Sequence, residues 1–354
     1  MAGGTGGHIF PGLAVAQELN LRNWTAYWLG SVGGMEVDLV GKTGIPLHLI
    51  TISGLRGNGL YGWIKSPFTL LKAVFQALKI IKKIEPDVVI GFGGFASGPG
   101  GVASFLTRTP LIIHEQNAVA GLTNKTLAKF ADKVFQAFPN AFKKAKNIQT
   151  VGNPIRQKII DLNKNKQASS KINILIIGGS RGARVFNDIL PKVLSPIMLN
   201  NKINVRHQSG KGNFNSTISS YENNKIKLGK NLSVDEFIDD MREAYLWADL
   251  VICRAGALTV SEIAAVGIAA IFIPFPYAVD DHQTKNALWL VQQKAAILID
   301  EIDLKSKKSK DTIVALVEKP EKINEMAIKA KAIAYFDAVG IIADACETLI
   351  EEAA

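Results

Sequence analysis

Cysteine is scarce in this sequence. Only Cys253 and Cys346 occur among 354 residues, and they lie far apart along the chain. Two distant thiols exclude a disulfide framework and are typical of a protein that folds in a reducing compartment such as the cytoplasm. No group of His, Cys, Asp and Glu residues has the spacing of metal ligands. The sequence therefore predicts neither a metal site nor any other bound cofactor.

Long hydrophobic runs and a secretory signal are also absent. No apolar run reaches the roughly 18 to 20 residues of a membrane-spanning helix, and no signal peptide leads the chain. With 47% hydrophobic and 20% charged residues, the composition is globular rather than disordered. The 354 residues exceed what one hydrophobic core usually supports. We expect two domains, in a protein that is soluble or attached to a membrane surface.

Positive charge is concentrated in the first part of the chain. Residues 1–150 contain 15 Lys and Arg against 7 Asp and Glu, and so carry most of the net charge of +10. A basic domain beside a nearly neutral one favours an anionic partner for the first domain. Nucleic acid fits less well than an acidic membrane surface, because no recognisable nucleic-acid module accompanies the charge.

A basic and apolar helix is predicted from about Ser66 to Ile84. Aromatic residues and lysines recur on one of its faces, and an apolar segment that should be a loop precedes it. Lysines around exposed apolar side chains predict contact with an anionic membrane surface. The alternative is a helix buried on two sides whose lysines face solvent. The residues predicted to meet the membrane are Leu60, Trp63, Phe68, Lys72, Phe75 and Lys79.

Two glycine-rich segments, Gly3–His8 and Gly178–Ala183, each lie where a strand should lead into a helix. Strand and helix patterns alternate through both halves, which predicts two doubly wound α/β domains with parallel sheets. Phosphate groups bind at such strand-to-helix turns, so an enzyme of phosphorylated substrates is expected. The predicted strands are 26–29, 47–50, 87–94, 110–115 and 133–138 (the last of the first sheet), then 172–177, 203–208, 250–253, 270–274 and 296–299.

The start of the chain does not fit this scheme. The segment Gly3–His8 should follow a strand, yet only Met1 and Ala2 precede it. Either the first sheet lacks a central strand or the chain begins one strand late. A missing central strand would leave its neighbours without hydrogen-bond partners, which is costly. We therefore expect a truncated start.

Polar residues that could carry chemistry follow the glycine segments of the first half. His8 lies at a helix entrance, where an imidazole can act as a general base or simply bind the acceptor. The run His114–Asn117 ends a predicted parallel strand, a place that favours a site over a polar turn. The glycines of segment 91–101 allow either close backbone approach to a ligand or a flexible surface loop.

The second half offers a matching set of polar residues. Ser180 and the amides after it can hold a phosphate. Glu262, expected in the first turn of a helix, can accept hydrogen bonds from both hydroxyls of a ribose or merely complement the helix dipole. His282 and Gln283 begin a polar helix that could bind sugar hydroxyls or form a solvated cap.

Five motifs taken together resemble the MurG family, the peptidoglycan N-acetylglucosaminyltransferases that convert lipid I to lipid II. They follow one another from residue 3 to about residue 290, and jointly they are very specific. The missing first strand is the one clear departure from the family pattern. The motifs are Gly3–His8 with Pro11-Gly12, His114–Asn117, Gly152–Arg156, Gly178–Ser180 and Gly256–Glu262.

The resemblance implies a GT-B fold, in which two doubly wound Rossmann-like domains with parallel sheets face each other across a cleft. Residues 1–154, joined by the C-terminal helix 336–354, would bind undecaprenyl-linked lipid I and the membrane. Residues 155–335 would bind UDP-N-acetylglucosamine (UDP-GlcNAc). The resemblance also implies a peripheral location on the cytoplasmic face of the bacterial plasma membrane, and partners among proteins of cell-wall synthesis or division.

The same resemblance implies an inverting transfer to the C4 hydroxyl of the muramyl sugar, without an essential metal. His8 is the first choice for the base and Glu115 the second, and the sequence does not separate them. Ser180 would contact the diphosphate, Glu262 the ribose and Gln283 the sugar. The acceptor would meet Gly93, Gly94 and Asn124. The donor would meet Thr5, Gly6, Gly7, Asn117, Arg156, Ser180, Phe237, Ile238 (these two at the uracil), Ala257, Leu258, Thr259, Glu262, His282 and Gln283.

Three other functions compete with this one. Another GT-B enzyme could use a nucleotide sugar on a different lipid, such as diacylglycerol, and only acceptor choice would distinguish it. A UDP-sugar epimerase would need neither a lipid nor a basic amphipathic helix. A non-catalytic, membrane-recruited scaffold would bind UDP-sugar without turnover, and substitution of His8 and Glu115 would leave it unharmed.

Overall fold

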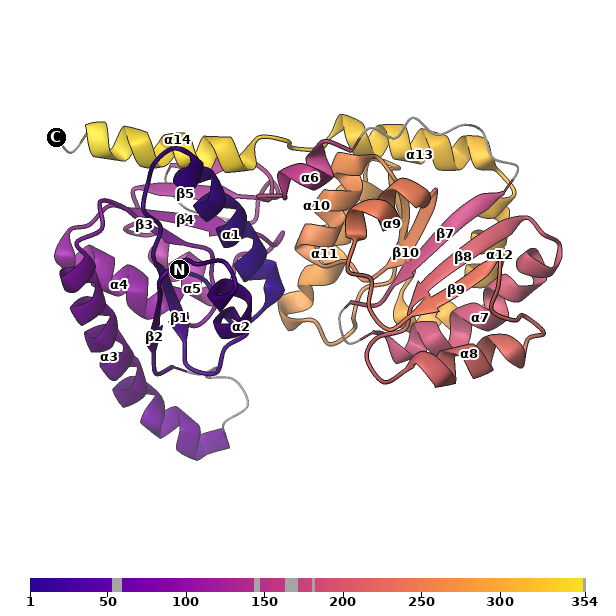
Figure 1. The fold of residues 1–354 in the computed structure, drawn as a ribbon, viewed down its shortest axis with the longest axis horizontal. Coiled ribbons are helices and arrows are strands. Elements are labelled where there is room, and N and C mark those ends of the chain that lie inside the picture. Colours follow the sequence, from indigo (N-terminus) through magenta and orange to yellow (C-terminus); the bar gives the residue numbers. More distant parts are fainter. Residues whose placement is uncertain (53–58, 143–146, 163–170, 180–181, 353–354) are drawn as a thin grey trace. The chain divides into compact units, whose positions relative to one another are not determined.

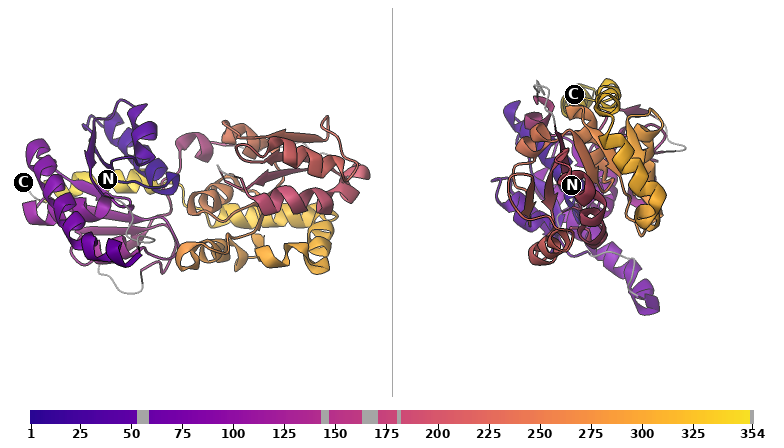
Figure 2. Two further views of the ribbon diagram at one scale, coloured as in Figure 1. Left: turned by 90° about the horizontal axis from the view of Figure 1, so that it is seen from below. Right: turned by 90° about the vertical axis from the view of Figure 1, so that its right-hand side faces the viewer.

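Two compact units make up the chain (Figures 1 and 2). The computed structural model describes residues 1–52, 59–142, 147–162, 171–179 and 182–352, with the backbone alone at 59–66. Unit 1 comprises Met1–Arg156 and Tyr335–Ala354, and unit 2 comprises Gln157–Ala334. These divisions lie within about two residues of the predicted domain boundaries.

Short parallel strands form the centre of unit 1. They are β1 (Trp28–Ser31), β2 (Leu47–Ile50), β3 (Val89–Gly91), β4 (Leu111–Glu115), β5 (Lys133–Gln136) and β6 (Ile148–Thr150). The last four form one sheet in the order β3-β4-β5-β6, whereas β1 pairs with β2 in a separate sheet. Every residue of β4 is buried, as a central strand covered on both faces requires. The helices of this unit are α1 (Gly6–Leu21), α2 (Glu36–Gly41), α3 (Gly59–Ile84), α4 (Ser97–Thr107), α5 (Leu122–Leu127) and α14 (Ala338–Glu351).

Met1 lies where the expected central strand of the first sheet would run. Its amino group donates to the carbonyl oxygen of Ile90 at 2.7 Å, and its own carbonyl accepts from the amide of Phe92 at 2.9 Å. The first residue therefore extends the hydrogen-bonding pattern of β3, but no ladder among the described residues joins β3 to β1. A cavity of about 560 Å³, lined by Met1, Trp28 and Val89 among others, lies beside it.

The C-terminal helix belongs to unit 1. Ile342, Cys346 and Leu349 of α14 share one buried cluster with Ile9 and Leu13 of α1, and Figure 1 shows the two helices side by side. At the rim of this contact, Arg22 forms ion pairs with Asp344 at 2.6 Å and Glu347 at 3.3 Å. Helix α14 thus packs on α1 within unit 1.

Helix α3 buries only one of its faces. Ala73, Ala77 and Ile81 belong to the core of unit 1, at helical spacing. Phe68 and Phe75, by contrast, are 75% and 60% exposed. The alternative of a helix buried on two sides is therefore wrong for its described side chains.

Unit 2 is built on a single six-stranded parallel sheet, ordered β12-β11-β10-β7-β8-β9. Its strands are β7 (Ile172–Ile177), β8 (Ile203–Gln208), β9 (Leu232–Asp235), β10 (Leu250–Cys253), β11 (Ala269–Phe272) and β12 (Ala296–Leu298). Its helices are α6 (Gln157–Ile160), α7 (Arg184–Leu199), α8 (Phe214–Glu222), α9 (Met241–Trp247), α10 (Ala257–Val266), α11 (His282–Val291), α12 (Lys307–Val317) and α13 (Pro320–Ala332).

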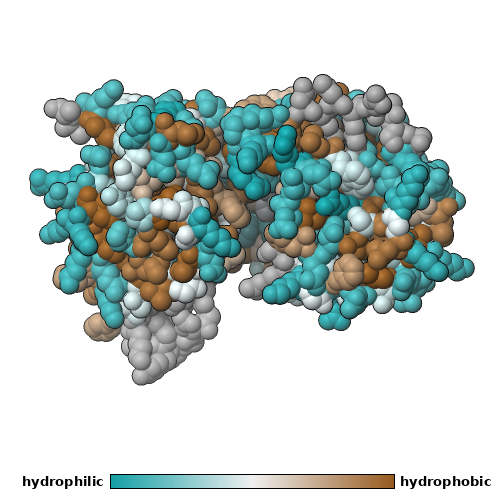
Figure 3. Space-filling model, viewed as in Figure 1, coloured by the Kyte–Doolittle hydropathy of each residue, from teal (hydrophilic) through white to brown (hydrophobic). Residues whose placement is uncertain are grey.

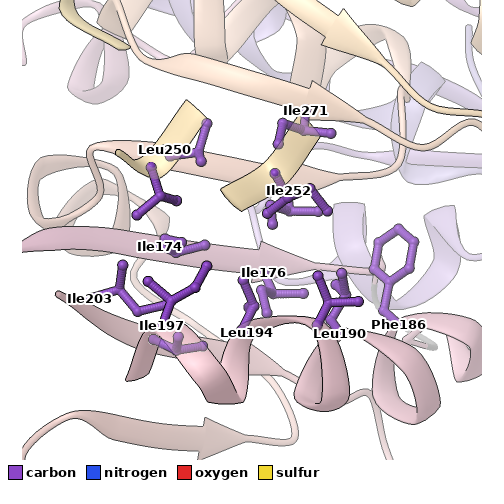
Figure 4. Close-up of a cluster of buried hydrophobic side chains, with 14 of the residues drawn as sticks. Ile174, Ile176, Phe186, Leu190, Leu194, Ile197, Ile203, Leu250, Ile252 and Ile271 are labelled. Carbon is purple, nitrogen blue, oxygen red and sulfur yellow. The ribbon is translucent and has the colours of Figure 1, made fainter. Parts of the chain in front are cut away.

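The core of unit 2 forms where α7 covers this sheet. Figure 4 shows Leu190, Leu194 and Ile197 of α7 pointing toward Ile174 and Ile176 of β7. These side chains recur at helical spacing on α7 and at every second position on β7, so each element presents one apolar face. At the surface, hydrophilic residues cover most of the face drawn in Figure 3, and hydrophobic residues gather in patches on each unit.

Two edge strands were not predicted, and the start of one helix was predicted wrongly. Segment 133–138 is not the last strand of its sheet, because β6 follows it, and β9 was not predicted either. Both missed strands are short and lie at the edges of their sheets, and neither is a continuous apolar run. Helix α3 begins at Gly59 rather than near Ser66, so the apolar segment that precedes Pro67 is helical. Ser66-Pro67 resembled a helix start because proline suits the first turn.

Candidate functional site

The first glycine segment is a tight turn that leads into α1. Gly4 adopts a φ of +86°, which glycine tolerates best. Thr5 is the extended residue before the helix, and its carbonyl accepts hydrogen bonds from the amides of His8 and Ile9. Gly6, Gly7 and His8 therefore form the first helical turn rather than a loop. The first amide groups of a helix have no partner within it and suit an anion.

A buried carboxylate supports this turn. Glu36 is fully buried and accepts hydrogen bonds from the amide and the hydroxyl of Ser31, at 2.7 and 2.6 Å, and from the amide of Gly4 at 3.1 Å. Burial by itself raises the pKa of Glu36, but the hydrogen bonds from Ser31 and Gly4 outweigh burial and lower it. Glu36 was not predicted as a site residue, although the glycines close to it at Gly33-Gly34 signal a crowded turn.

The second glycine turn of unit 1 packs against the first. Gly93 and Gly94 both adopt positive φ angles, of 94° and 81°. A β-carbon on Gly94 would overlap the carbonyl of Gly3, and one on Gly93 would lie 3.1 Å from the His8 ring and 3.7 Å from Nδ2 of Asn124. Close backbone approach, rather than a flexible loop, therefore explains these glycines. The turn brings Gly93, Asn124 and His8 together.

A chain of hydrogen bonds runs inward from His8. Its Nδ1 atom lies 2.8 Å from Oε1 of Gln116, and Nε2 of Gln116 lies 3.0 Å from Nδ1 of His114. Nε2 of His114 lies 2.8 Å from the carbonyl oxygen of Gly152. Burial lowers the pKa of His114 to about 4, although the hydrogen bond to Gly152 opposes this shift. His114 is therefore neutral near pH 7.

Glu115 holds the loop that follows β4. One carboxylate oxygen accepts from the amide and the side chain of Asn117, and the other accepts from the amide of Gly121 and from Nδ2 of Asn124. Glu115 is only 2% exposed. Asn124 is also buried, and within the described part of the chain its Oδ1 has no hydrogen-bond partner.

Arg156 ends the first stretch of unit 1. Its side chain is exposed, and its guanidinium carbon lies 5.9 Å from the centre of the Phe10 ring. Among the predicted donor residues, Thr5, Gly6, Gly7, Asn117 and Arg156 belong to unit 1, and the others belong to unit 2.

The glycine segment of unit 2, like that of unit 1, contains a glycine at positive φ before a helix. Gly182 adopts a φ of +72°, and a β-carbon there would overlap the carbonyl of Ser209. Helix α7 begins two residues later, at Arg184. The predicted phosphate ligand Ser180 lies outside the described residues. Asn187 is buried on the first turn of α7, donates from Nδ2 to the carbonyl of Ser209, and leaves its Oδ1 without a partner among the described residues.

Gln208, which the sequence analysis missed, links two loops of unit 2. It lies at the end of β8, where Nε2 donates to the carbonyl of Gly179 at 2.9 Å and Oε1 accepts from the amide of Ile238 at 3.1 Å. Ile238 is buried, whereas its neighbour Phe237 is 55% exposed. An exposed phenyl ring beside a fixed buried residue provides a flat apolar surface for stacking.

Helix α10 presents Glu262 in its second turn. Ala257, Leu258 and Thr259 form the first turn, so the prediction of Glu262 in the first turn is wrong by one turn. Oε2 of Glu262 accepts a hydrogen bond from the hydroxyl of Tyr245 at 3.0 Å. Tyr245 lies on α9 and is almost completely buried, so it fixes the direction of this carboxylate.

Gln283 joins the ends of two neighbouring strands. Its Oε1 accepts from the amide of Ala255, after β10, and from the amide of Phe275, after β11, at 3.3 and 2.9 Å. The NH₂ group of Gln283 makes no hydrogen bond within the described residues. His282 precedes it and contacts the carbonyl of Val279 through Nδ1 at 2.7 Å.

Two family models together match most of the chain. The glycosyltransferase family 28 N-terminal domain matches residues 1–136, and the glycosyltransferase family 28 C-terminal domain matches residues 173–339.

The chain belongs to glycosyltransferase family 28.

Full-length relatives agree with this assignment. The chain is 47% identical over 352 residues to a protein of Psychromonas ingrahamii, with 99% of this chain and 98% of the relative covered. It is 50% identical over 338 residues to a protein of Haemophilus ducreyi, with 93% and 92% covered. Both relatives are named UDP-N-acetylglucosamine--N-acetylmuramyl-(pentapeptide) pyrophosphoryl-undecaprenol N-acetylglucosamine transferase.

Solved structures of glycosyltransferases share the fold of this family 28 chain. The crystal structure of Acinetobacter baumannii MurG is 40% identical, with a TM-score of 0.85 and 98% of each chain covered. The glycosyltransferase of kitacinnamycin, at 14% identity and a TM-score of 0.67, shares the fold alone. The predicted fold class, two Rossmann-like domains of the GT-B type, and the predicted resemblance to MurG are both confirmed.

Two negative findings apply to the described part of this family 28 chain. No helix there is long and apolar enough to cross a membrane. No group of three or more His, Cys, Asp or Glu residues within it is placed to hold a metal ion.

Proposed function

We propose that this family 28 enzyme transfers N-acetylglucosamine from UDP-GlcNAc to the C4 hydroxyl of the muramyl sugar in lipid I. The product is lipid II, the precursor of peptidoglycan. The names of the full-length relatives support this substrate pair. The observation that carries the chemistry is the His8 imidazole, fixed by Gln116 beside a helix N-terminus and against the Gly93 turn.

The reaction needs one base and one stabilised leaving group. The C4 oxygen attacks the anomeric carbon from the face opposite UDP, so the new C–O bond forms as the bond to the β-phosphate breaks with inversion. His8 takes the hydroxyl proton on its ring nitrogen, and UDP departs with the electron pair of the broken bond. Helix N-termini and free amides stabilise the charge that develops on the diphosphate. No cofactor takes part in these steps.

Between the two candidates for the base, the contacts favour His8. Both oxygens of Glu115 already accept hydrogen bonds, four in all, from the loop that follows β4. These bonds direct both carboxylate oxygens toward the loop rather than toward an acceptor hydroxyl. Glu115 then positions Asn117 and Asn124. Asn124 and the backbone of Gly93 and Gly94, which lie together in this turn, bind the acceptor sugar.

Unit 2 binds the donor. The diphosphate is held by two parts of the unit: Ser180, and the first turn of α10 with Ala257, Leu258 and Thr259. Glu262 binds the ribose hydroxyls in a direction set by Tyr245. Phe237 and Ile238 border the uracil, and Gln283, beside His282, donates its free NH₂ to the sugar. Thr5, Gly6, Gly7, Asn117 and Arg156, which belong to unit 1, stay predicted donor residues.

The decisive assay measures UDP release from UDP-GlcNAc in the presence of EDTA, with and without a short-chain lipid I analogue. We expect release that depends on the analogue and a disaccharide product, because the mechanism needs no metal. Diacylglycerol in place of the analogue serves as the control acceptor. Release with diacylglycerol, or conversion of UDP-GlcNAc to its epimer, would establish one of the competing functions instead.

The donor site is tested by Gln283→Glu. Glutamate keeps the acceptor atoms that bind the amides of Ala255 and Phe275, but it replaces the NH₂ donor with an acceptor. We expect the Kd for UDP-GlcNAc to rise about tenfold or more, as one lost hydrogen bond predicts. Titration calorimetry with UDP alone is the control, since UDP lacks the sugar. Equal weakening of UDP and UDP-GlcNAc would place Gln283 at the diphosphate.

The exposed face of α3 supports a peripheral membrane site. Phe68, Leu71 and Phe75 are at least 60% exposed, and Nζ of Lys79 lies 4.9 Å from the centre of the Phe75 ring. Lys72 is exposed beside them. The side chains of Leu60 and Trp63, also predicted to meet the membrane, lie outside the described residues. We infer that this face binds the anionic cytoplasmic surface of the plasma membrane, where lipid I and proteins of cell-wall synthesis or division are met.

Vesicle co-sedimentation tests the membrane site. The double substitution of Lys72→Glu and Lys79→Glu should weaken binding to phosphatidylglycerol vesicles at least tenfold, at about 1 kcal/mol per basic residue. Phe68→Ser should weaken binding to neutral and anionic vesicles alike. Leu199→Ser, which removes a 58% exposed side chain from unit 2, is the matched control. Unchanged binding of the lysine variant would rule out this face.

A further inference from the structure

Gln116 is buried between two histidines, and its side chain touches both. Its Oε1 lies 2.8 Å from Nδ1 of His8, and its Nε2 lies 3.0 Å from Nδ1 of His114. Gln116 is 1% exposed; its contact with His114 is buried and its contact with His8 is partly buried. The orientation of the Gln116 carboxamide therefore decides which ring nitrogens of His8 and His114 are protonated.

The backbone of His114 settles the direction of the carboxamide. Nε2 of Gln116 also lies 3.1 Å from the carbonyl oxygen of His114. A carbonyl oxygen only accepts hydrogen bonds, so the group that faces it must be the NH₂ group. The reversed amide would bury two acceptors against each other and leave a donor unpaired, which is costly.

The protons of His114 follow from the same rule. Its Nδ1 accepts from Gln116, so its Nε2 must carry the proton that it donates to the carbonyl oxygen of Gly152 at 2.8 Å. Burial keeps this ring neutral. The hydrogen bonds that join Gln116, His114 and Gly152 thus end at backbone carbonyl oxygens on both sides. Each of these bonds has a single possible direction.

The consequence reaches His8. Since Oε1 of Gln116 can only accept, Nδ1 of His8 must carry the proton, and in the neutral ring the lone pair then lies on Nε2. We propose that Gln116 is a positioning residue that fixes His8 in the Nδ1–H tautomer and so presents Nε2 as the proton acceptor. The link to catalysis rests on the proposed function, but the tautomer is a property of the protein alone.

Nitrogen-15 NMR of the full chain, labelled at histidine and free of substrate, tests the tautomer directly. At pH 8 we expect His8 to show a protonated Nδ1 and an unprotonated Nε2, with the signals assigned from the spectrum of His8→Gln. A His8 ring protonated at Nε2 would overturn the proposal, whatever the activity of the enzyme.

The role of Gln116 is tested by Gln116→Met, which keeps the length of the side chain and removes both polar atoms. We expect a mixture of His8 tautomers, a fall in kcat of roughly tenfold and an unchanged Kd for UDP-GlcNAc. Gln136→Met is the matched control, because Gln136 is a buried glutamine on β5 that bonds Thr150 and the amide of Phe142 instead. That control should leave His8 unchanged. A Gln116→Met protein whose His8 stays wholly in the Nδ1–H form would overturn the positioning role.

The two claims fail separately. If wild-type His8 shows the expected tautomer but the protein transfers no GlcNAc to the lipid I analogue, the proposed function is wrong and the tautomer assignment stands. If transfer occurs and His8 is protonated at Nε2, the proposed function stands and Gln116 does not have this role.

Discussion

A backbone carbonyl oxygen can accept a hydrogen bond but never donate one, and the candidate site of unit 1 depends on that constraint. The carbonyl oxygens of His114 and Gly152 fix the orientation of the Gln116 carboxamide and the tautomer of the His114 imidazole. The direction of the hydrogen bond between Gln116 and His8 follows from that orientation. The imidazole therefore needs no charged neighbour to be oriented.

Glutamines that contact the loops after parallel strands perform related tasks in both units. In unit 2, the NH₂ group of Gln208 donates to the carbonyl of Gly179, and its oxygen accepts from the amide of Ile238. Gln283 uses its oxygen on two amides and keeps its donor group free among the described residues. A carboxamide offers one end that accepts and one that donates, so a single side chain can hold a loop and still face a ligand. The glycine turns next to these residues allow the backbone to approach closely.

The elements that could be predicted from the sequence are those whose signal is local. Strands β7 and β10 have their predicted bounds because each is a largely apolar, buried run that ends at a turn. Strand β6 could not be found, because three residues of mixed polarity carry no period. The contacts of Glu36 and Gln116 join residues far apart in the sequence, so no spacing reveals them. Gln116 does stand within the motif His114–Asn117, but the motif does not show that its side chain orients His8.

The central claim is that His8 removes the proton from the acceptor hydroxyl. The most direct test is the single-turnover rate of GlcNAc transfer to a lipid I analogue by His8→Gln, with both substrates saturating, compared with the wild-type chain. The account predicts a rate at least about a hundredfold lower, as the loss of a general base requires, together with an unchanged affinity for UDP-GlcNAc. A variant that transfers GlcNAc at nearly the wild-type rate would contradict the account and assign the proton to another group.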